Sequence, residues 1–109
     1  MTKYVFDIDG TICISLEGLY QDAVPLRERI LIINKLFTEG NEIILYTARG
    51  MGSSGNNEII AKEKWEELTI NQLKTWGVKF HKLYFGKPSG DIYVDDKGIS
   101  DLDFFKQSC

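Results

Sequence analysis

The sequence has few of the residues that build zinc centres and disulfide frameworks. Its 109 residues include one histidine, two cysteines and two prolines, and no CxxC motif is present. A zinc site or a histidine-based catalytic triad is therefore not expected. We expect Cys13 and Cys109 to be free thiols in a reducing compartment.

Long hydrophobic runs and an excess of positive charge are also missing. No apolar stretch approaches the roughly 18–20 residues that cross a membrane, and the first residues lead directly into charged side chains. The 13 basic and 16 acidic residues give a net charge of −3, without the basic surface of a nucleic-acid-binding protein. We therefore expect a soluble, cytoplasmic protein that binds neither nucleic acid nor membrane. The overall charge does not exclude a phosphorylated small molecule, because local donors and a metal ion can outweigh it.

Short apolar runs alternate with stretches of helical periodicity, which is the pattern of a single α/β domain over residues 1–109. Strands are predicted over residues 3–8, 42–47, 82–85 and 91–95, and helices from Pro25 to Gly40 and from Asn56 or Asn57 to Trp76. Strand–helix–strand units with continuous apolar strands predict a parallel sheet with right-handed crossovers. Helices flanking this sheet would give a small three-layer α/β fold.

The segments between these elements are predicted from composition. Residues 11–24 show no helical period and are interpreted as a flap or irregular hairpin, and residues 48–57 as a mobile loop or plain linker. The segment 101–106 is predicted to form a helical turn or short edge element that packs Phe104 and Phe105. The inner face of the second helix is expected to carry Ala61, Trp65, Leu68 and Trp76.

Polar residues gather where the predicted strands end. The first strand runs into Asp7 and Asp9, which alternation places on the same side of the chain, before Gly10 allows a turn. Two carboxylates so close repel each other unless a cation or a shared proton relieves them, which indicates a divalent metal ion. The same residues also fit an ordinary strand end followed by an Asp-Gly turn.

The other strand ends allow similar pairs of interpretations. Thr47 and Arg49 can bind a phosphate oxygen or can simply finish a polar strand end. Lys87 can hold its ammonium group over a site or lie solvated in a loop. Asp95 and Asp96 form a second acidic pair or a helix cap. Their occurrence in series favours one site, because ligands of open α/β sheets bind at the carboxyl ends of the strands.

These patterns together resemble a known family. The segment DIDGT at 7–11, Thr47 after EIILY, Lys87 before a proline and the acidic pair after YV are similar to the four motifs of the haloacid-dehalogenase-like (HAD) phosphohydrolases. The resemblance covers nearly the whole chain and implies a Rossmann-like sheet, Mg²⁺ and an aspartyl-phosphate intermediate. The short length and the segment YVDDKG are most similar to small capless phosphatases of capsular or surface-polysaccharide biosynthesis. That narrower resemblance implies a phosphorylated sugar or polysaccharide precursor as substrate.

The chemistry of the residues agrees with the roles that the resemblance implies. Asp7 would attack phosphorus without an activating base, and Asp9 would protonate the leaving oxygen and later take a proton from water. The resemblance places Mg²⁺ on the Asp7 side chain, the Asp9 main-chain carbonyl and Asp95, with Asp96 farther out or on a metal-bound water. Hard oxygen ligands of this kind are those that Mg²⁺ prefers.

The remaining motif residues are expected to contact the substrate. Thr47 and Lys87 would bind the transferring phosphoryl oxygens. The main chain around Gly10 and Thr11 and the Arg49 side chain would add further contacts.

The segments 11–24 and 48–57 are too short for a cap domain of their own, so the site is expected to be open. Either a bulky substrate or a neighbouring subunit of a homo-oligomer would then cover it. Tyr20, Arg49, Met51 and the loop 51–57 are candidates for substrate specificity.

Three other functions share parts of this pattern. A phosphoacceptor (receiver-like) signalling domain also clusters Asp, Thr and Lys around Mg²⁺, but its acceptor aspartate precedes the Thr or Ser. Here Thr47 precedes Lys87 and the second acidic pair comes last, so the motif order favours the hydrolase. A phosphotransferase of the same fold and an inactive binding partner are the remaining alternatives. All motif positions are filled, which lends no support to loss of activity.

Overall fold

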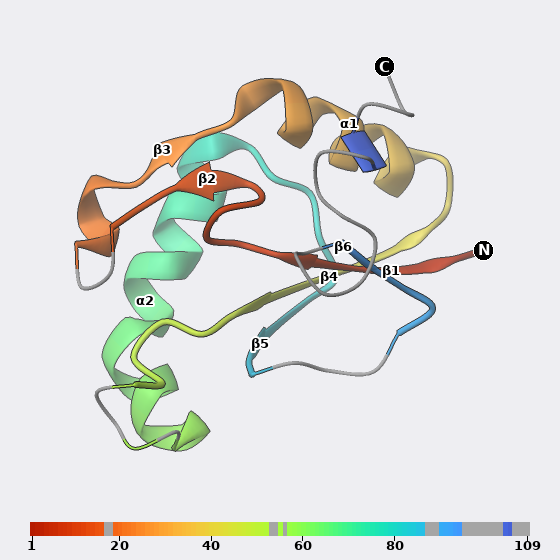
Figure 1. Ribbon diagram of the computed structural model, residues 1–109. Helices are drawn as coiled ribbons and strands as arrows, with labels where there is room; N and C mark the ends of the chain where they lie inside the picture. Colours follow the sequence, from red (N-terminus) through yellow and green to blue (C-terminus); the bar gives the residue numbers. More distant parts are fainter. Residues whose placement is uncertain (17–18, 53–54, 56, 87–89, 95–103, 106–109) are drawn as a thin grey trace.

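A four-stranded parallel sheet forms the centre of the protein, in the order β5-β4-β1-β6 (Figure 1). The computed structural model describes residues 1–16, 19–52, 55, 57–86, 90–94 and 104–105. The strands are β1 (Lys3–Asp7), β4 (Glu42–Thr47), β5 (Lys82–Phe85) and β6 (Ile92–Val94). All four correspond to the short apolar runs from which strands were predicted.

The register of the sheet brings the strand ends together. β1 lies between β4 and β6 and is parallel to both, with Asp7 opposite Tyr46 and Phe6 opposite Val94. β4 ends where Thr47 lies opposite Phe85 of β5. Because all the strands run in one direction, their carboxyl ends meet at a single edge of the sheet. The chain steps one way from β1 to β4 and β5 and then returns to the other side of β1, so the switch point lies beside β1.

Both long helices pack on one face of the sheet. Helix α1 (Arg27–Thr38) connects β1 to β4 and α2 (Glu58–Trp76) connects β4 to β5. Both crossovers step in the same direction, so right-handed connections place both helices on the same side. One core accordingly contains Phe6, Ile43, Leu45 and Val94 from the strands with Ile30, Ile33, Leu73 and Trp76 from the helices. The described residues thus account for the sheet and one helical layer of the predicted three-layer fold.

The helix that was predicted to begin at Pro25 begins later. Pro25 belongs instead to a short strand, β3 (Val24–Pro25), which pairs antiparallel with β2 (Cys13–Ile14). The amide of Leu26 also donates to the Ile12 carbonyl, at 2.8 Å. This pairing holds the chain extended through Leu26, so α1 can start only at Arg27. We call residues 13–16 and 19–25, which include the 3-10 turn η1 (Tyr20–Asp22), the β2–β3 hairpin.

The inner face of α2 also differs from the prediction. The buried residues of this helix are Ala61, Thr69, Leu73 and Trp76. Trp65 and Leu68, expected inside, are only partly buried. A threonine lies at an inner position because its hydroxyl has a buried partner, which is described below.

The two phenylalanines near the carboxyl end pack into the core, as predicted. Phe104 and Phe105 are both buried, and the ring of Phe104 lies edge-on to that of Phe6 with centroids 5.6 Å apart. Arg29 of α1 places its guanidinium over the Phe105 ring, at 4.9 Å. The aromatic pair therefore joins α1 to the centre of the sheet.

Side-chain and glycine caps set the ends of α2. Asn57 precedes the helix, and its side-chain oxygen accepts hydrogen bonds from the amides of Ile59 and Ile60. Gly77 ends the helix in the left-handed conformation, with φ 72°. Within the described ranges, no helix combines the length and the apolar character needed to cross a membrane.

Replacing Asn57 with Ala should lower the free energy of unfolding by about 1 kcal/mol, because two helix amides lose their acceptor. Urea denaturation of the purified variant measures the change. Asn57→Asp keeps the acceptor and is the matched control, for which we expect little or no loss. Equal losses in the two variants would contradict the capping role.

Candidate active site

A tight turn after β1 sets the direction of the two first-motif carboxylates. Ile8 is fully buried, and its carbonyl accepts hydrogen bonds from the three successive amides of residues 11–13. Gly10 has φ 87°, and its amide donates to the Cys13 carbonyl at 2.8 Å, which closes the turn. With Ile8 directed into the core, Asp7 and Asp9 on either side of it both line the same hollow.

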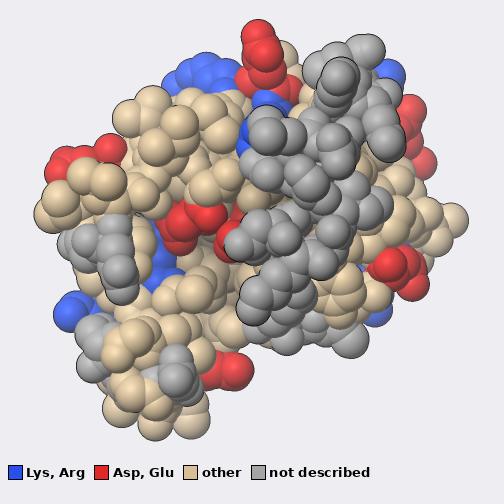
Figure 2. Space-filling model, in the orientation of Figure 1, with Lys and Arg blue, Asp and Glu red and all other residues tan. Residues whose placement is uncertain are grey.

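This hollow lies at the carboxyl ends of β1 and β4, beside the β2–β3 hairpin. Its volume is about 450 Å³, and it is open to solvent. Figure 2 shows acidic and basic atoms side by side in a hollow on this face of the molecule. The described residues that line it are Asp7, Asp9, Ser15, Tyr20, Ala48, Arg49, Met51 and Gly52.

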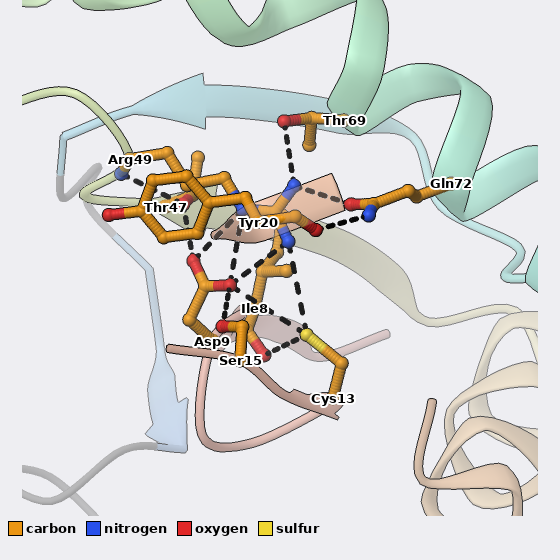
Figure 3. Close-up of polar contacts among 9 residues, drawn as sticks. All are labelled: Ile8, Asp9, Cys13, Ser15, Tyr20, Thr47, Arg49, Thr69 and Gln72. Carbon is orange, nitrogen blue, oxygen red and sulfur yellow. Dashed lines mark hydrogen bonds and ion pairs between the residues drawn. The ribbon is translucent and has the colours of Figure 1, made fainter. Parts of the chain in front are cut away.

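The Asp9 carboxylate accepts hydrogen bonds from four side chains, two in the β2–β3 hairpin and two at the end of β4 and just after it (Figure 3). The Cys13 thiol is the most distant of these donors, at 3.7 Å from Oδ1. The Ser15 hydroxyl donates to Oδ1 at 2.7 Å, and the Thr47 hydroxyl donates to Oδ2 at 2.9 Å. Arg49 donates to Oδ1 from Nη2 at 3.0 Å and from Nε at 3.1 Å, and Nε also lies 3.2 Å from Oδ2. The orientation of Asp9 is therefore determined by residues of the hairpin, of β4 and of the loop that follows β4.

Arg49 is enclosed by the protein, with a side chain that is 0% exposed. Its Nη1 donates to the Thr69 hydroxyl at 3.1 Å and to the Gln72 side-chain oxygen, both on α2. Its guanidinium lies 5.0 Å from the centre of the Tyr20 ring, and Gln72 in turn donates to the Tyr20 carbonyl. A buried charge is tolerated only when it is paired and hydrogen-bonded, and these contacts satisfy that requirement.

Several residues that were expected to contact the substrate are hydrogen-bonded within the protein. Arg49 lines the hollow, but its guanidinium has no solvent exposure and is hydrogen-bonded to Asp9 and to α2. Thr47 is fully buried, donates to Asp9, and accepts a hydrogen bond from the Arg49 amide at 3.1 Å. Thr11 is buried, and its carbonyl accepts a hydrogen bond from Arg29. Among the described residues around the hollow, Gly10, Thr11 and Thr47 do not line it.

Three predicted site residues, Lys87, Asp95 and Asp96, lie outside the described residues. Where the chain is described, no group of three or more His, Cys, Asp or Glu side chains could hold a metal ion. The donor chemistry nevertheless fits Mg²⁺ in part, because the Asp7 carboxylate in the hollow is a hard oxygen donor. The Asp9 carboxylate is already bonded to side-chain donors, which leaves its main-chain carbonyl as the Asp9 group considered for the metal.

The sequence interpretation missed Ser15, Thr69 and Gln72. Ser15 lies in the hairpin, where no periodicity marks a special position. Thr69 and Gln72 are three residues apart on α2, so they lie on neighbouring positions of one helix face. A polar pair beside the apolar Leu73 and Trp76 was the available signal, and it indicated a buried polar partner.

The loop after β4 depends on a glycine. Gly50 has φ 76°, and a Cβ atom there would lie 2.5 Å from the Trp65 side chain. Trp65 also lies edge-on to the Tyr20 ring, with centroids 4.9 Å apart. This close approach joins the loop, the β2–β3 hairpin and α2 around Arg49.

Comparisons with known proteins support the fold. No protein-family model and no curated protein matches the sequence. A target protein from Vibrio cholerae is 25% identical, with 96% of this chain and 88% of that chain covered and a TM-score of 0.80. The D,D-heptose 1.7-bisphosphate phosphatase from B. bronchiseptica, complexed with magnesium and phosphate, is 13% identical over 79% of this chain and 50% of that chain, with a TM-score of 0.54. A chain of the Pnkp1/Rnl/Hen1 RNA repair complex is 14% identical over 97% of this chain and 30% of that chain, with a TM-score of 0.57.

These likenesses, together with the parallel sheet and its helices, show a small Rossmann-like α/β core. The level of identity to the heptose phosphatase and the RNA repair chain is too low to carry more than the fold.

Cys13 lies against the site but is not in a setting that activates a thiol. Burial raises the pKa of the Cys13 thiol from 9.0 to about 12, and the negative charge of Asp9 acts in the same direction. The nearby Arg49 cation opposes the shift without cancelling it. The thiol therefore stays protonated at neutral pH.

In a Cys109→Ser background, Cys13 should react with iodoacetamide at pH 8 on the order of 10²- to 10³-fold more slowly in the native protein than in urea. The reason is that only the thiolate reacts, and the raised pKa reduces its population in the folded state. Mass spectrometry of timed samples measures the rates. Native labelling as fast as that of the unfolded chain would show that the thiol is neither buried nor protonated as described.

Proposed function

We propose that the protein is an Mg²⁺-dependent phosphomonoester hydrolase that acts through an aspartyl-phosphate intermediate on Asp7. The observation that carries the proposal is that Asp7 and Asp9 lie together in one open hollow at the switch point of the sheet. Ligands of open α/β sheets bind at such a point. The structurally similar heptose bisphosphate phosphatase adds support from its own named activity.

The strand order argues against the receiver-like alternative. A receiver domain has its strands in the order 2-1-3-4-5, with the first strand beside the third. In this protein the four parallel strands follow the order third, second, first, fourth along the sheet. The order of the motifs and the order of the strands therefore both favour the hydrolase.

In the first chemical step, a carboxylate oxygen of Asp7 attacks the phosphorus of the substrate. The bond between phosphorus and the ester oxygen breaks as the new bond to Asp7 forms. Asp9 gives a proton to the departing oxygen, so the alcohol leaves in its neutral form. The products of this step are the free alcohol and a phosphoryl group on Asp7.

In the second step, water attacks the phosphoryl group on Asp7. Asp9, now without its proton, accepts one from the attacking water, and the bond between phosphorus and the Asp7 oxygen breaks. Inorganic phosphate leaves, and both carboxyl groups return to their initial states. The two aspartates must therefore act on one phosphorus atom, which their shared position in the hollow supports.

The remaining motif residues follow strands that end beside these aspartates. Gly86 donates its amide to the Thr47 carbonyl at 3.0 Å, and Lys87 comes next in the sequence. Val94 lies opposite Phe6, and Asp95 comes next. We propose that Lys87 binds the transferring phosphoryl oxygens. Thr47, which was expected to share this role, is buried and donates its hydroxyl hydrogen to Asp9, so we propose that it supports that carboxylate instead.

Asp7, the Asp9 main-chain carbonyl and Asp95 would hold Mg²⁺, with Asp96 farther out. When bound, the ion would offset the negative charge of the phosphoryl group.

The proposed substrate is a small phosphorylated metabolite, with a phosphorylated sugar or polysaccharide precursor as the narrower proposal. Between β1 and α1 the described residues form only the β2–β3 hairpin and its 3-10 turn, and the hollow remains open. An open site accepts a bulky substrate or is completed by a second copy of the chain. Tyr20 and Met51, which line the hollow, are proposed to contact the part of the substrate beyond the phosphate.

Asp7→Asn should abolish phosphate release while leaving the fold intact, because the amide cannot act as the nucleophile. The assay is phosphate release from a panel of phosphosugars, phosphorylated polyols and nucleotides, with Mg²⁺ or with EDTA. Asp22→Asn is the matched control, since Asp22 is exposed and does not line the hollow, and it should retain activity. Turnover by Asp7→Asn comparable to wild type would contradict the nucleophile assignment. Transfer to an added alcohol in place of release to water would favour the phosphotransferase.

Asp95→Asn should raise the Mg²⁺ concentration needed for half-maximal activity at least about 10-fold, because a charged oxygen ligand is lost. A metal titration of initial rates measures this. The same titration on Asp91→Asn serves as the control, since Asp91 accepts a hydrogen bond from the Lys3 amide at the opposite end of β1. An unchanged titration in Asp95→Asn would remove that residue from the metal site.

A further inference from the structure

We propose that Arg49 is a positioning residue that orients the Asp9 carboxyl group for proton exchange through its Oδ2 atom. The proposal rests on the function proposed above, in which Asp9 acts as acid and base. It assigns Arg49 a role within the protein in place of the substrate contact expected from the sequence.

The geometry of Arg49 supports an internal role. The side chain is 0% exposed, while that of Asp9 is 23% exposed. Nε and Nη2 both donate to Asp9, and a planar fork of this kind fixes direction as well as distance. A substrate in the hollow would therefore meet Asp9, and the guanidinium behind it would hold that carboxyl group in place.

The two oxygen atoms of Asp9 have unequal surroundings. Oδ1 lies within bonding distance of the Ser15 hydroxyl, of Nε and Nη2 of Arg49, and, at 3.7 Å, of the Cys13 thiol. Oδ2 accepts hydrogen bonds from the Thr47 hydroxyl and from one nitrogen of Arg49, Nε, at 3.2 Å. Oδ1 thus has four donors and Oδ2 has two, one of which it shares with Oδ1, so Oδ2 has the greater acceptor capacity left for a proton.

A second set of contacts holds the guanidinium on the side away from Asp9. Thr69 and Gln72 bond to Nη1, which does not contact Asp9, and the Tyr20 ring covers the guanidinium. Gln72 also donates to the Tyr20 carbonyl, so α2 holds the cation and the hairpin together. Loss of a contact at Nη1 should therefore change the orientation of the Asp9 carboxyl group, although Asp9 itself is not substituted.

A positioning role predicts a dependence on the leaving group. An ester with a poor leaving group needs a proton from Asp9 when its P–O bond breaks, whereas a nitrophenolate departs without one. The probes are benzyl phosphate, phenyl phosphate and 4-nitrophenyl phosphate, with kcat/KM measured for each. This constant reports the steps up to the first bond cleavage, in which Asp9 acts as an acid.

Arg49→Gln should lower kcat/KM about 10- to 100-fold for benzyl phosphate and less than about 3-fold for 4-nitrophenyl phosphate, because general acid catalysis is typically worth ~10²–10⁴-fold. Asp9→Asn should show the same pattern with a larger loss. Adding Arg49→Gln to Asp9→Asn should change kcat/KM by less than about 3-fold, because residues that act through one group are not additive. Arg49→Lys, which keeps the charge and loses the fork, should fall between wild type and Arg49→Gln.

Two further variants keep the test decisive if Arg49→Gln does not fold. Thr69→Val removes one support of the guanidinium at nearly constant volume and should show a weaker form of the same leaving-group pattern. Arg29→Gln is the matched arginine control, since Arg29 contacts Thr11 and Phe105 and not Asp9. It should leave the ratio of kcat/KM for benzyl and 4-nitrophenyl phosphate unchanged.

The outcomes separate this inference from the proposed function. Equal losses for all three esters in Arg49→Gln, or in Thr69→Val where Arg49→Gln does not fold, would overturn the positioning role while Asp7-dependent hydrolysis stands. Additive losses in the Asp9→Asn, Arg49→Gln double variant would overturn it as well. Hydrolysis that persists in Asp7→Asn or in the presence of EDTA would overturn the proposed function, as would the absence of hydrolysis of any ester by the wild type. Either result would also overturn the role of Arg49.

Discussion

The ion pair between Arg49 and Asp9 is the interaction on which the site depends. A guanidinium without solvent contact must be paired, and Asp9 supplies the opposite charge at 3.0 Å. The other donors of Arg49 then require acceptors from α2, which Thr69 and Gln72 provide. One buried charge thus joins the turn after β1, the end of β4, the β2–β3 hairpin and α2.

The sheet determines where this pair can form. Asp9 follows β1 and Arg49 follows β4, and these two strands are neighbours with the same direction. The carboxyl ends of parallel neighbours lie side by side, so two residues that are 40 positions apart can meet. The hairpin is short and stays beside the strand ends, where its Ser15 and Tyr20 complete the hollow. The fold thereby produces a site that is open to solvent on one side and held by hydrogen bonds between Asp9, Arg49 and α2 on the other.

Much of the fold could be predicted because its signals are local. Apolar runs predicted the four strands, and the caps at Asn57 and Gly77 predicted the ends of α2 within a residue. The predicted start of α1 was wrong. Pro25 is a residue that commonly begins a helix, but here its pairing with Cys13 keeps the chain extended. The prediction of which residues form the inner face of α2 was partly wrong for a similar reason. A hydrophobic pattern gives no place to a buried threonine whose partner, Arg49, is distant in the sequence.

Local patterns in the chain were enough to predict the parallel α/β architecture. They also predicted the position of Asp7 and Asp9, because strand alternation and a turn at Gly10 direct both carboxylates to one side. The same patterns predicted that polar residues would collect at the strand ends. The contacts that those residues make with one another depend on how distant parts of the chain pack together. Whether Arg49 faces a substrate or Asp9 depends on the burial of its side chain, and burial is a property of surrounding elements. The contacts of Asp9 with Ser15, Thr47 and Arg49 join parts of the chain that no local pattern relates.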